Sequence, residues 1–140
     1  RRAIILAALG HDLYEDTKVT REYIIKKFGA QIDSLIFEMT NIYGDREIRK
    51  YCEKLKTISE AGLLIKLADM SDNMIGGAYA AHENGHKWTK EFLYPIVHQQ
   101  WLTVSKINFS QFSKTALYLK SLVDFGHHGL QMAIKNYPSR

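Results

Sequence analysis

The chain has 140 residues, of which 46% are hydrophobic and 24% charged. This length and composition fit one soluble globular domain and exclude a disordered or collagen-like chain. The formal net charge of +4 is mildly basic and favours an anionic ligand without requiring nucleic acid. The single cysteine, Cys52, excludes an internal disulfide and is consistent with a reducing cytoplasm.

An apolar run, AIILAAL, occupies residues 3–9 after two arginines and has some likeness to a targeting segment. It is too short to cross a bilayer, and no small-residue cleavage pattern follows it. We therefore expect a buried helix here. Because the chain begins without Met, we expect a fragment whose N-terminal helices are missing.

Four polar or ionisable residues follow this run within six positions: His11, Asp12, Glu15 and Asp16. Burying such groups is unfavourable unless a cation or mutual hydrogen bonds compensate for the lost hydration. Their placement directly after an apolar helix therefore indicates a functional site.

The next segments show helical spacing and turn signals. Thr20 is expected to cap a helix that ends near Gly29. Apolar residues at steps of three, four and seven predict two further helices, over 32–39 and 48–55. The sequence NIYGD at 41–45 predicts the connection between them.

A second polar cluster lies in GLLIKLADMSDNM, residues 62–74. Asp69 and Asn73 are four positions apart and share a helix face, with Asp72 beside them. A divalent cation would take an imidazole nitrogen from the first cluster and carboxylate oxygens from both. Taken alone, the second cluster also fits an Asp69 helix cap and a solvated Asp72.

The C-terminal part is also predicted to be helical. Thr89 is expected to cap one helix, and Gly126 to end another that carries Leu117. His127 and His128 would then lie at a helix end, where imidazolium meets the negative end of the helix dipole. With no strand-like alternation, we predict an all-α, single-domain helical bundle of about six to eight helices over residues 1–140.

Several short motifs follow one another in order over about residues 1–98. They are His11-Asp12, Glu15-Asp16-Thr17, Val19-Thr20, Phe28-Gly29, Met39-Thr40, Lys66-Leu67-Ala68-Asp69 and Asn73-Met74. The series resembles the HD-domain hydrolases of the Rel/SpoT and small alarmone hydrolase type. An ordered series is more specific than any one short motif.

The resemblance implies an HD hydrolase domain that removes the 3′-pyrophosphate of guanosine tetra- or pentaphosphate. It implies one Mn²⁺ bound by His11, Asp12 and Asp69, and a water-activating role for Glu15 and Asp16. A metal that polarises a phosphoryl oxygen, together with a carboxylate that accepts a proton, suits this hydrolysis.

By the same resemblance, Asn73 would line the nucleotide pocket. Arg46, Lys50 and Lys54, from the segment between the motifs, are candidates for binding the substrate phosphates, although each also fits a solvated helix face. The expected partner is a small-molecule nucleotide, with no nucleic acid and no membrane, in the cytoplasm. The sequence does not indicate an oligomeric state.

Two departures from the family pattern leave alternatives open. The family has a fourth ligand, a His well upstream of the His-Asp doublet, whereas this chain begins ten residues before His11. Met70-Ser71-Asp72 stands where the family usually has a basic residue, an apolar one and often His or Tyr. The alternatives are an HD phosphohydrolase for another nucleotide and a non-catalytic HD-type binding or regulatory module.

A different motif also occurs, since His82-Glu83-Asn84-Gly85-His86 matches the H-E-x-x-H pattern of zincins. In that pattern, two His on one helix bind zinc and the Glu is the base. Asn84-Gly85 is also a turn signal, and no residue downstream is well placed as a third ligand. The zincin is therefore the less favoured interpretation.

Overall fold

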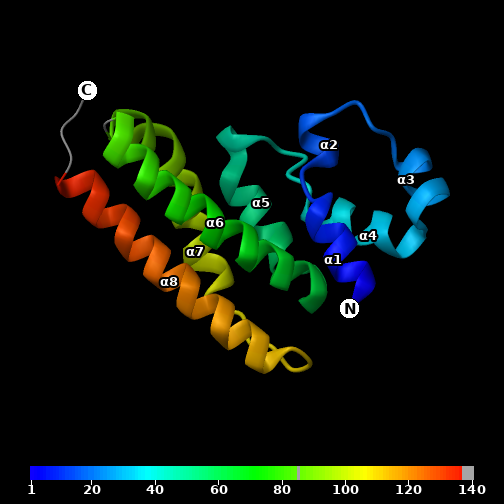
Figure 1. Ribbon diagram of the computed structural model, residues 1–140. Coiled ribbons are helices and arrows are strands. Elements are labelled where there is room, and N and C mark those ends of the chain that lie inside the picture. The colour runs from blue at the N-terminus through cyan, green and yellow to red at the C-terminus, as the bar shows by residue number, and fades with distance from the viewer. Residues whose placement is uncertain (85, 137–140) are drawn as a thin grey trace. The chain divides into compact units, whose positions relative to one another are not determined.

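The computed structural model describes residues 1–84 and 86–136. Within these residues it contains eight α-helices, one 3-10 segment, one π-helical segment and no β-strand (Figure 1). The prediction of an all-α fold with about six to eight helices is confirmed. The chain divides into two compact units, Arg1–Lys66 and Leu67–Arg140. The assignment of residues 1–140 to one HD-type domain stays a prediction.

The first unit contains five α-helices, a 3-10 segment and the start of a sixth helix. They are α1 (Arg2–Leu9), α2 (Leu13–Asp16), α3 (Arg21–Phe28), α4 (Ala30–Met39), η1 (Asp45–Glu47), α5 (Ile48–Leu55) and the first residues of α6 (Glu60–Asn84). The second unit contains the rest of α6, a π-helical turn η2 (Thr89–Leu93), α7 (Tyr94–Val104) and α8 (Ser113–Asn136).

The core of the first unit joins α1, α3, α4 and the start of α6. Ala7, Ile24 and Ile36 are at most 1% exposed, and Ile65 belongs to the same cluster. Burial of a large apolar side chain contributes roughly 1.5–3 kcal/mol, so this cluster fixes the helices that carry the first polar motif.

The predicted ends of α3 are confirmed. Thr20 Oγ1 accepts a hydrogen bond from the backbone N–H of Tyr23 at 3.3 Å, as an N-cap residue does. At the other end, Gly29 has a φ of 94°, which is readily adopted only by glycine. α4 begins directly after this turn.

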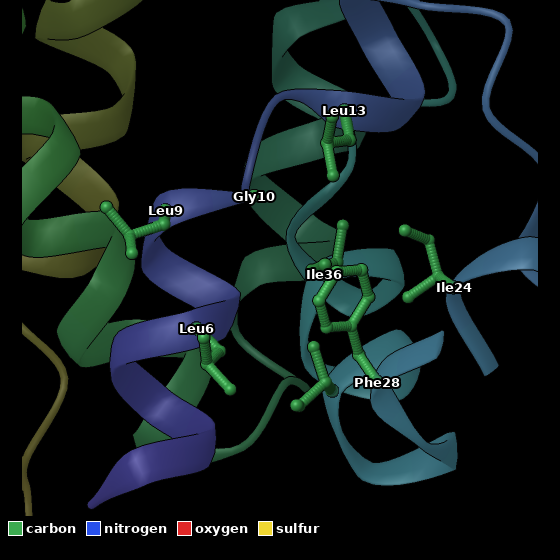
Figure 2. Close-up of a pocket in the computed structure, with 8 residues that line it drawn as sticks. Leu6, Leu9, Gly10, Leu13, Ile24, Phe28 and Ile36 are labelled. Atoms are coloured by element: carbon green, nitrogen blue, oxygen red, sulfur yellow. The ribbon is translucent and has the colours of Figure 1, made fainter. Parts of the chain in front are cut away.

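An apolar cavity of about 260 Å³ lies within the first unit, next to the core (Figure 2). Its walls carry no titratable side chain, although one lining residue, Gly10, directly precedes His11. The chemistry of the polar motif therefore lies outside this cavity. It is lined by Leu6, Leu9, Gly10, Leu13, Ile24, Phe28, Ile32 and Ile36.

In the second unit, α6 and α8 pack closely and run in the same direction (Figure 1). A side chain at Gly126 would place its Cβ 3.1 Å from Met74 Cβ. The prediction that Gly126 ends a helix is wrong, because α8 continues to Asn136. The glycine serves the close approach of two helices instead.

The predicted capping role of Thr89 is also wrong. Thr89 is 1% exposed, and its hydroxyl donates to the carbonyl oxygen of Gly77 in α6 at 3.4 Å. A buried hydroxyl requires a hydrogen-bond acceptor. Here the acceptor belongs to a neighbouring helix, and Thr89 lies inside the π-helical turn that leads into α7.

His127 lies in the middle of α8, not at a helix end as predicted. It is 4% exposed, its Nε2 lies 2.8 Å from Nδ1 of His98 in α7, and its ring stacks on Trp101 with centroids 4.0 Å apart. Burial lowers the pKa of His127, and the electrostatic effect of the neighbouring His98 lowers it further. Trp101 Nε1 donates to Asp124 at 2.8 Å. Polar and aromatic contacts therefore join α7 to α8.

Candidate functional site

The His-Asp doublet lies in the turn between α1 and α2, as the apolar-to-polar change in the sequence predicts. The Nδ1 N–H of His11 donates to the carbonyl oxygen of Ala8 at 2.8 Å. This bond fixes the ring and directs Nε2 toward Asp12, whose Oδ2 lies 3.0 Å away. The His11 side chain is 30% exposed and that of Asp12 is 54% exposed, so solvent and ligands reach both.

This arrangement fits two adjacent ligands of a divalent metal. Metal-ligating His residues usually donate their other ring N–H to a carbonyl or carboxylate, as His11 does. Two ligand atoms that bind a metal at about 2.1 Å and at a right angle lie about 3.0 Å apart. Imidazole nitrogen and carboxylate oxygen together suit a hard or borderline cation.

The other expected ligand, Asp69, lies in the part of α6 that belongs to the second unit. Asn73 Nδ2 donates to Asp69 Oδ1 at 2.9 Å, which confirms that the two residues share a helix face. Over residues 1–84 and 86–136, the structure contains no group of three or more His, Cys, Asp or Glu side chains with metal-binding geometry. The ligand set His11, Asp12 and Asp69 therefore stays a prediction.

The segment that departs from the family pattern is mostly internal. Met70 is 0% and Ser71 8% exposed, and Ser71 Oγ donates to the carbonyl oxygen of Ala68 at 2.8 Å. Asp72, by contrast, is exposed. Of the three altered residues, Asp72 is therefore the one whose chemistry a ligand at Asn73 would meet.

Glu15 and Asp16 form the last residues of α2, one helical turn after Asp12. The backbone N–H groups of both bond to the Asp12 carbonyl oxygen, at 3.0 and 2.9 Å. Glu15 Oε1 accepts a hydrogen bond from the backbone N–H of Asn41 at 2.7 Å. The Glu-Asp pair is exposed, and one of its carboxylates has a defined position.

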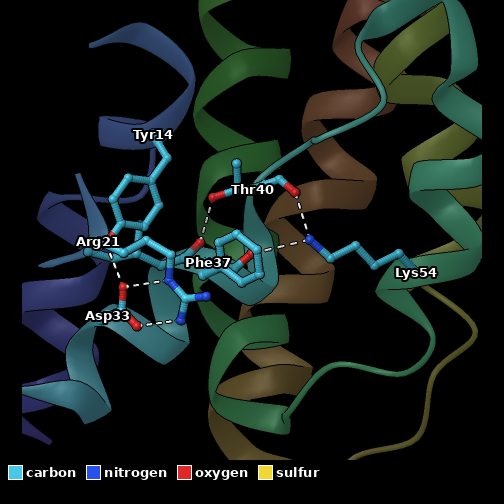
Figure 3. A network of polar contacts seen from close by, with 7 residues as sticks. Tyr14, Arg21, Asp33, Phe37, Thr40 and Lys54 are labelled. Atoms are coloured by element: carbon cyan, nitrogen blue, oxygen red, sulfur yellow. Dashed lines mark hydrogen bonds and ion pairs between the residues drawn. The ribbon is translucent and has the colours of Figure 1, made fainter. Parts of the chain in front are cut away.

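A buried carboxylate, Asp33, ties the start of α4 to α2 and α3 (Figure 3). Arg21 Nε and Nη2 donate to its two oxygens at 3.0 and 2.6 Å, and the Tyr14 hydroxyl donates at 2.7 Å. The Arg21 guanidinium also lies 4.0 Å from the centre of the Phe37 ring. The segment that carries Glu15 and Asp16 is thus held on both sides, at Tyr14 and at Arg21.

The electrostatics of this network favour a charged Asp33. The hydrogen bonds from Arg21 lower the pKa of the Asp33 carboxyl, and the bond from Tyr14 acts in the same direction. Burial raises the pKa of the Tyr14 hydroxyl, as does its bond to Asp33. Asp33 therefore accepts these bonds as a carboxylate.

The three candidate phosphate-binding cations have different surroundings. Arg46 lies in η1 and is exposed. Lys50 pairs with Glu47 at 2.5 Å and its side chain is 62% exposed. Lys54 is half-buried, and its ammonium donates to the carbonyl oxygens of Thr40 and Phe37 at 2.7 and 3.2 Å. Their role in substrate binding stays a prediction.

Sequence reasoning missed Tyr14, Arg21 and Asp33. One signal was present, because Asp33 is an acidic residue among the apolar residues of the buried α4 face, Ile32, Leu35 and Ile36. A buried acid requires a partner. The partners, Arg21 and Tyr14, lie 12 and 19 positions from Asp33 in the sequence, so they are identified only by tertiary contacts.

The structure does not support the zincin interpretation of residues 82–86, which requires both His residues on one helix. His82 lies in α6 (Glu60–Asn84), whereas His86 is not helical, so the two histidines do not lie on one continuous helix. Gly85 is outside the described residues. His82 Nδ1 lies 3.2 Å from Glu83 Oε1. The turn predicted at Asn84-Gly85 includes Gly85 and therefore lies outside the described residues.

The first unit thus carries a solvent-accessible His-Asp doublet with a carboxylate pair one helical turn later. Comparison with known proteins shows two relatives. The chain is 30% identical over 127 residues to a guanosine-3′,5′-bis(diphosphate) 3′-pyrophosphohydrolase of Borreliella burgdorferi, and 36% identical over 77 residues to the guanosine-3′,5′-bis(diphosphate) 3′-pyrophosphohydrolase MESH1 of Drosophila melanogaster.

These matches confirm the resemblance that the motif series predicted: the chain is homologous to part of these pyrophosphohydrolases. The matches cover 82% and 51% of this chain, but only 19% and 41% of the respective relatives. The chain thus spans less than half the length of either relative. No protein-family model matches the chain, and no solved structure matches it significantly.

Proposed function

We propose that the chain forms the hydrolase domain, or part of it, of a metal-dependent enzyme that removes the 3′-pyrophosphate of guanosine tetra- or pentaphosphate. The observation that carries the proposal is that both relatives have this activity in their names. The orientation of His11 Nε2 toward Asp12 supports it, because that pair suits a divalent cation.

Within this proposal, His11, Asp12 and Asp69 hold one Mn²⁺. When bound, the metal supplies an electrophilic centre for the phosphoryl oxygens. Glu15, held by the Asn41 N–H, orients the attacking water, and Glu15 or Asp16 accepts its proton.

The substrate is a small-molecule nucleotide, contacted by Asn73 at the nucleoside and by Arg46 and Lys50 at the phosphates. A cytoplasmic location is part of the proposal and is supported by the single, buried cysteine Cys52. Among the described residues, none of the helices has the length and apolar character to cross a bilayer.

An activity panel tests the substrate. The full-length protein is incubated with Mn²⁺ and with guanosine tetraphosphate, GTP, ATP and deoxynucleoside triphosphates, and products are separated by anion-exchange chromatography. We expect pyrophosphate and GDP from guanosine tetraphosphate. Turnover of only the other nucleotides would favour the HD phosphohydrolase of different specificity, which the exposed Asp72 beside Asn73 would explain.

A second experiment separates metal binding from chemistry. Asp69→Ala should lose both the metal and activity, since the cation would lose one of its two carboxylate ligands, Asp12 and Asp69. Glu15→Gln and Asp16→Asn should keep the metal while turnover falls roughly 100- to 10,000-fold, because an amide does not accept a proton. Metal content is measured by elemental analysis. Full turnover in both amide variants would contradict the assigned mechanism.

A further inference from the structure

Helix α5 contributes hydrogen bonds to the end of α4. Lys54 Nζ donates to the carbonyl oxygen of Thr40 at 2.7 Å and to that of Phe37 at 3.2 Å, as Figure 3 shows. The Tyr51 hydroxyl donates to the carbonyl oxygen of Met39. The last carbonyls of a helix lack partners in its regular bonding pattern. The contacts of Lys54 add to local bonds from the backbone N–H groups of Thr40 and Ile42, which donate to the carbonyl oxygens of Phe37 and Thr40 at 3.2 and 3.1 Å.

The peptide group that Lys54 holds is also the one that holds Glu15. The carbonyl of Thr40 and the N–H of Asn41 belong to one planar peptide unit. Lys54 bonds to its oxygen at 2.7 Å, and its N–H bonds to Glu15 Oε1 at 2.7 Å. Because the peptide unit is rigid, any displacement of its oxygen also moves its N–H. Hydrogen bonds that are linked in series also polarise each other.

The surroundings of Lys54 restrict its ammonium to this position. The side chain is half-buried, and Nζ lies 5.5 Å from the centre of the Phe37 ring. Burial lowers the pKa of Lys54, while the carboxylates of Glu15 and Glu38 raise it. Two of its three N–H donors are directed at carbonyl oxygens, unlike the exposed Lys50.

We propose that Lys54 is a positioning residue whose ammonium holds the Thr40-Asn41 peptide, so that this peptide's N–H orients the Glu15 carboxylate for hydrolysis. The inference rests on the proposed function, in which Glu15 acts on the attacking water. It replaces the direct phosphate contact expected for Lys54 from the sequence.

Steady-state kinetics of the full-length protein with Mn²⁺ and guanosine tetraphosphate test the proposal. In Lys54→Met, kcat should fall about 10- to 100-fold, the usual effect of losing a residue that orients a functional group, while KM changes less than about twofold. Lys54→Arg keeps the donors and should restore most of kcat. A raised KM with unchanged kcat would mean phosphate binding and would overturn the proposal.

Two matched controls separate positioning from general effects. Lys27→Met removes a charge from an exposed lysine of α3 and should leave kcat unchanged. Tyr51→Phe removes another α5 contact with the end of α4 and should lower Tm while changing kcat less than about twofold. If Tyr51→Phe reduced kcat as much as Lys54→Met, the effect would be a loosened helix end, and the proposal would be wrong.

Amide hydrogen exchange measured by NMR gives a readout independent of activity. The Asn41 amide should exchange at least about tenfold faster in Lys54→Met than in the wild type and in Lys27→Met, because its bond to Glu15 is weakened. Unchanged protection of this amide would overturn the proposal. Absence of hydrolysis by the wild type would instead refute the proposed function, and the exchange data would still decide the role of Lys54.

Lys54→Gln replaces Lys54→Met if the latter does not fold. The shorter, neutral side chain does not reach both carbonyl oxygens, and the same fall in kcat at nearly constant KM is expected. A kcat equal to that of the wild type would contradict the proposal.

Discussion

At the scale of single residues, Asp33 is the buried charge that organises the first unit. It is 2% exposed and accepts bonds from Arg21 and Tyr14, which belong to two other helices. The Arg21 side chain is 45% exposed, so solvent screens its charge and the pair contributes less than a fully buried one.

Asp33→Ala should lower the free energy of unfolding by roughly 1.5–3 kcal/mol, since it removes the charged acceptor of both donors. Tyr14→Phe removes one neutral donor and should lower it by about 0.5–1.5 kcal/mol. Urea denaturation followed by far-UV circular dichroism measures both. Equal effects of the two substitutions would show that Arg21 adds no stability through Asp33.

The site residues differ in how far the sequence could predict them. The position of His11 and Asp12 directly after α1 was predictable because it depends on local sequence, an apolar helix followed by polar residues. Their role as metal ligands stays a prediction. The sequence predicts phosphate binding for Lys54 because only its charge is visible there. Its contacts with Thr40 and Phe37 span 14 and 17 positions, and no local pattern encodes them.

At the scale of elements, the correct predictions concern helices defined by their own residues. The ends of α3 follow from Thr20 and Gly29, whose side chain and backbone freedom act within one turn. The wrong predictions concern Thr89 and Gly126. Both have the residue type of a helix end, but each is buried against α6, and this tertiary contact decides its role.

The two glycines of α8 provide a test of that explanation. Gly126→Ala should destabilise the protein by about 1–3 kcal/mol, because the added Cβ would lie 3.1 Å from Met74 Cβ. Gly129→Ala meets no atom within 4 Å and should stabilise it by about 0.5–1 kcal/mol through higher helix propensity. Urea denaturation measures both. Stabilisation by Gly126→Ala would mean that α6 and α8 adjust freely.

At the scale of the whole molecule, the two units should respond to acid at different pH values. The pKa of His127 is lowered, so the folded second unit favours the neutral ring. Below pH 6.5, the ordinary pKa of a His side chain, the unfolded chain therefore binds more protons than the folded chain. The stability that is present above this pH is lost as the pH falls further. In the first unit the pKa of Asp33 is lowered from 3.8, and its contribution is lost only below that value.

Both tryptophans, Trp88 and Trp101, belong to the second unit, so tryptophan fluorescence reports on that unit alone. We expect a fluorescence change as the pH falls below about 6.5, while the amide NMR signals of α4 stay unchanged until lower pH. A single transition in which both signals change together near pH 3 would contradict this order.

The sequence does not reveal where the units divide. The boundary between Lys66 and Leu67 falls inside GLLIKLADMS, which has no proline and no linker composition. In the structure, α6 runs through this segment as one helix. The division depends on which neighbours each turn of that helix contacts, and such contacts leave no mark on composition.

A boundary inside a helix determines how the chain can be dissected. Cutting between Lys66 and Leu67 would remove the i to i−4 partners of about four carbonyl groups on one side and about four N–H groups on the other. The cut would also lie beside Leu64 and Leu67, which are 6% and 0% exposed. A recombinant fragment meant to contain either unit should therefore carry all of α6, with its ends placed before Glu60 or after Asn84.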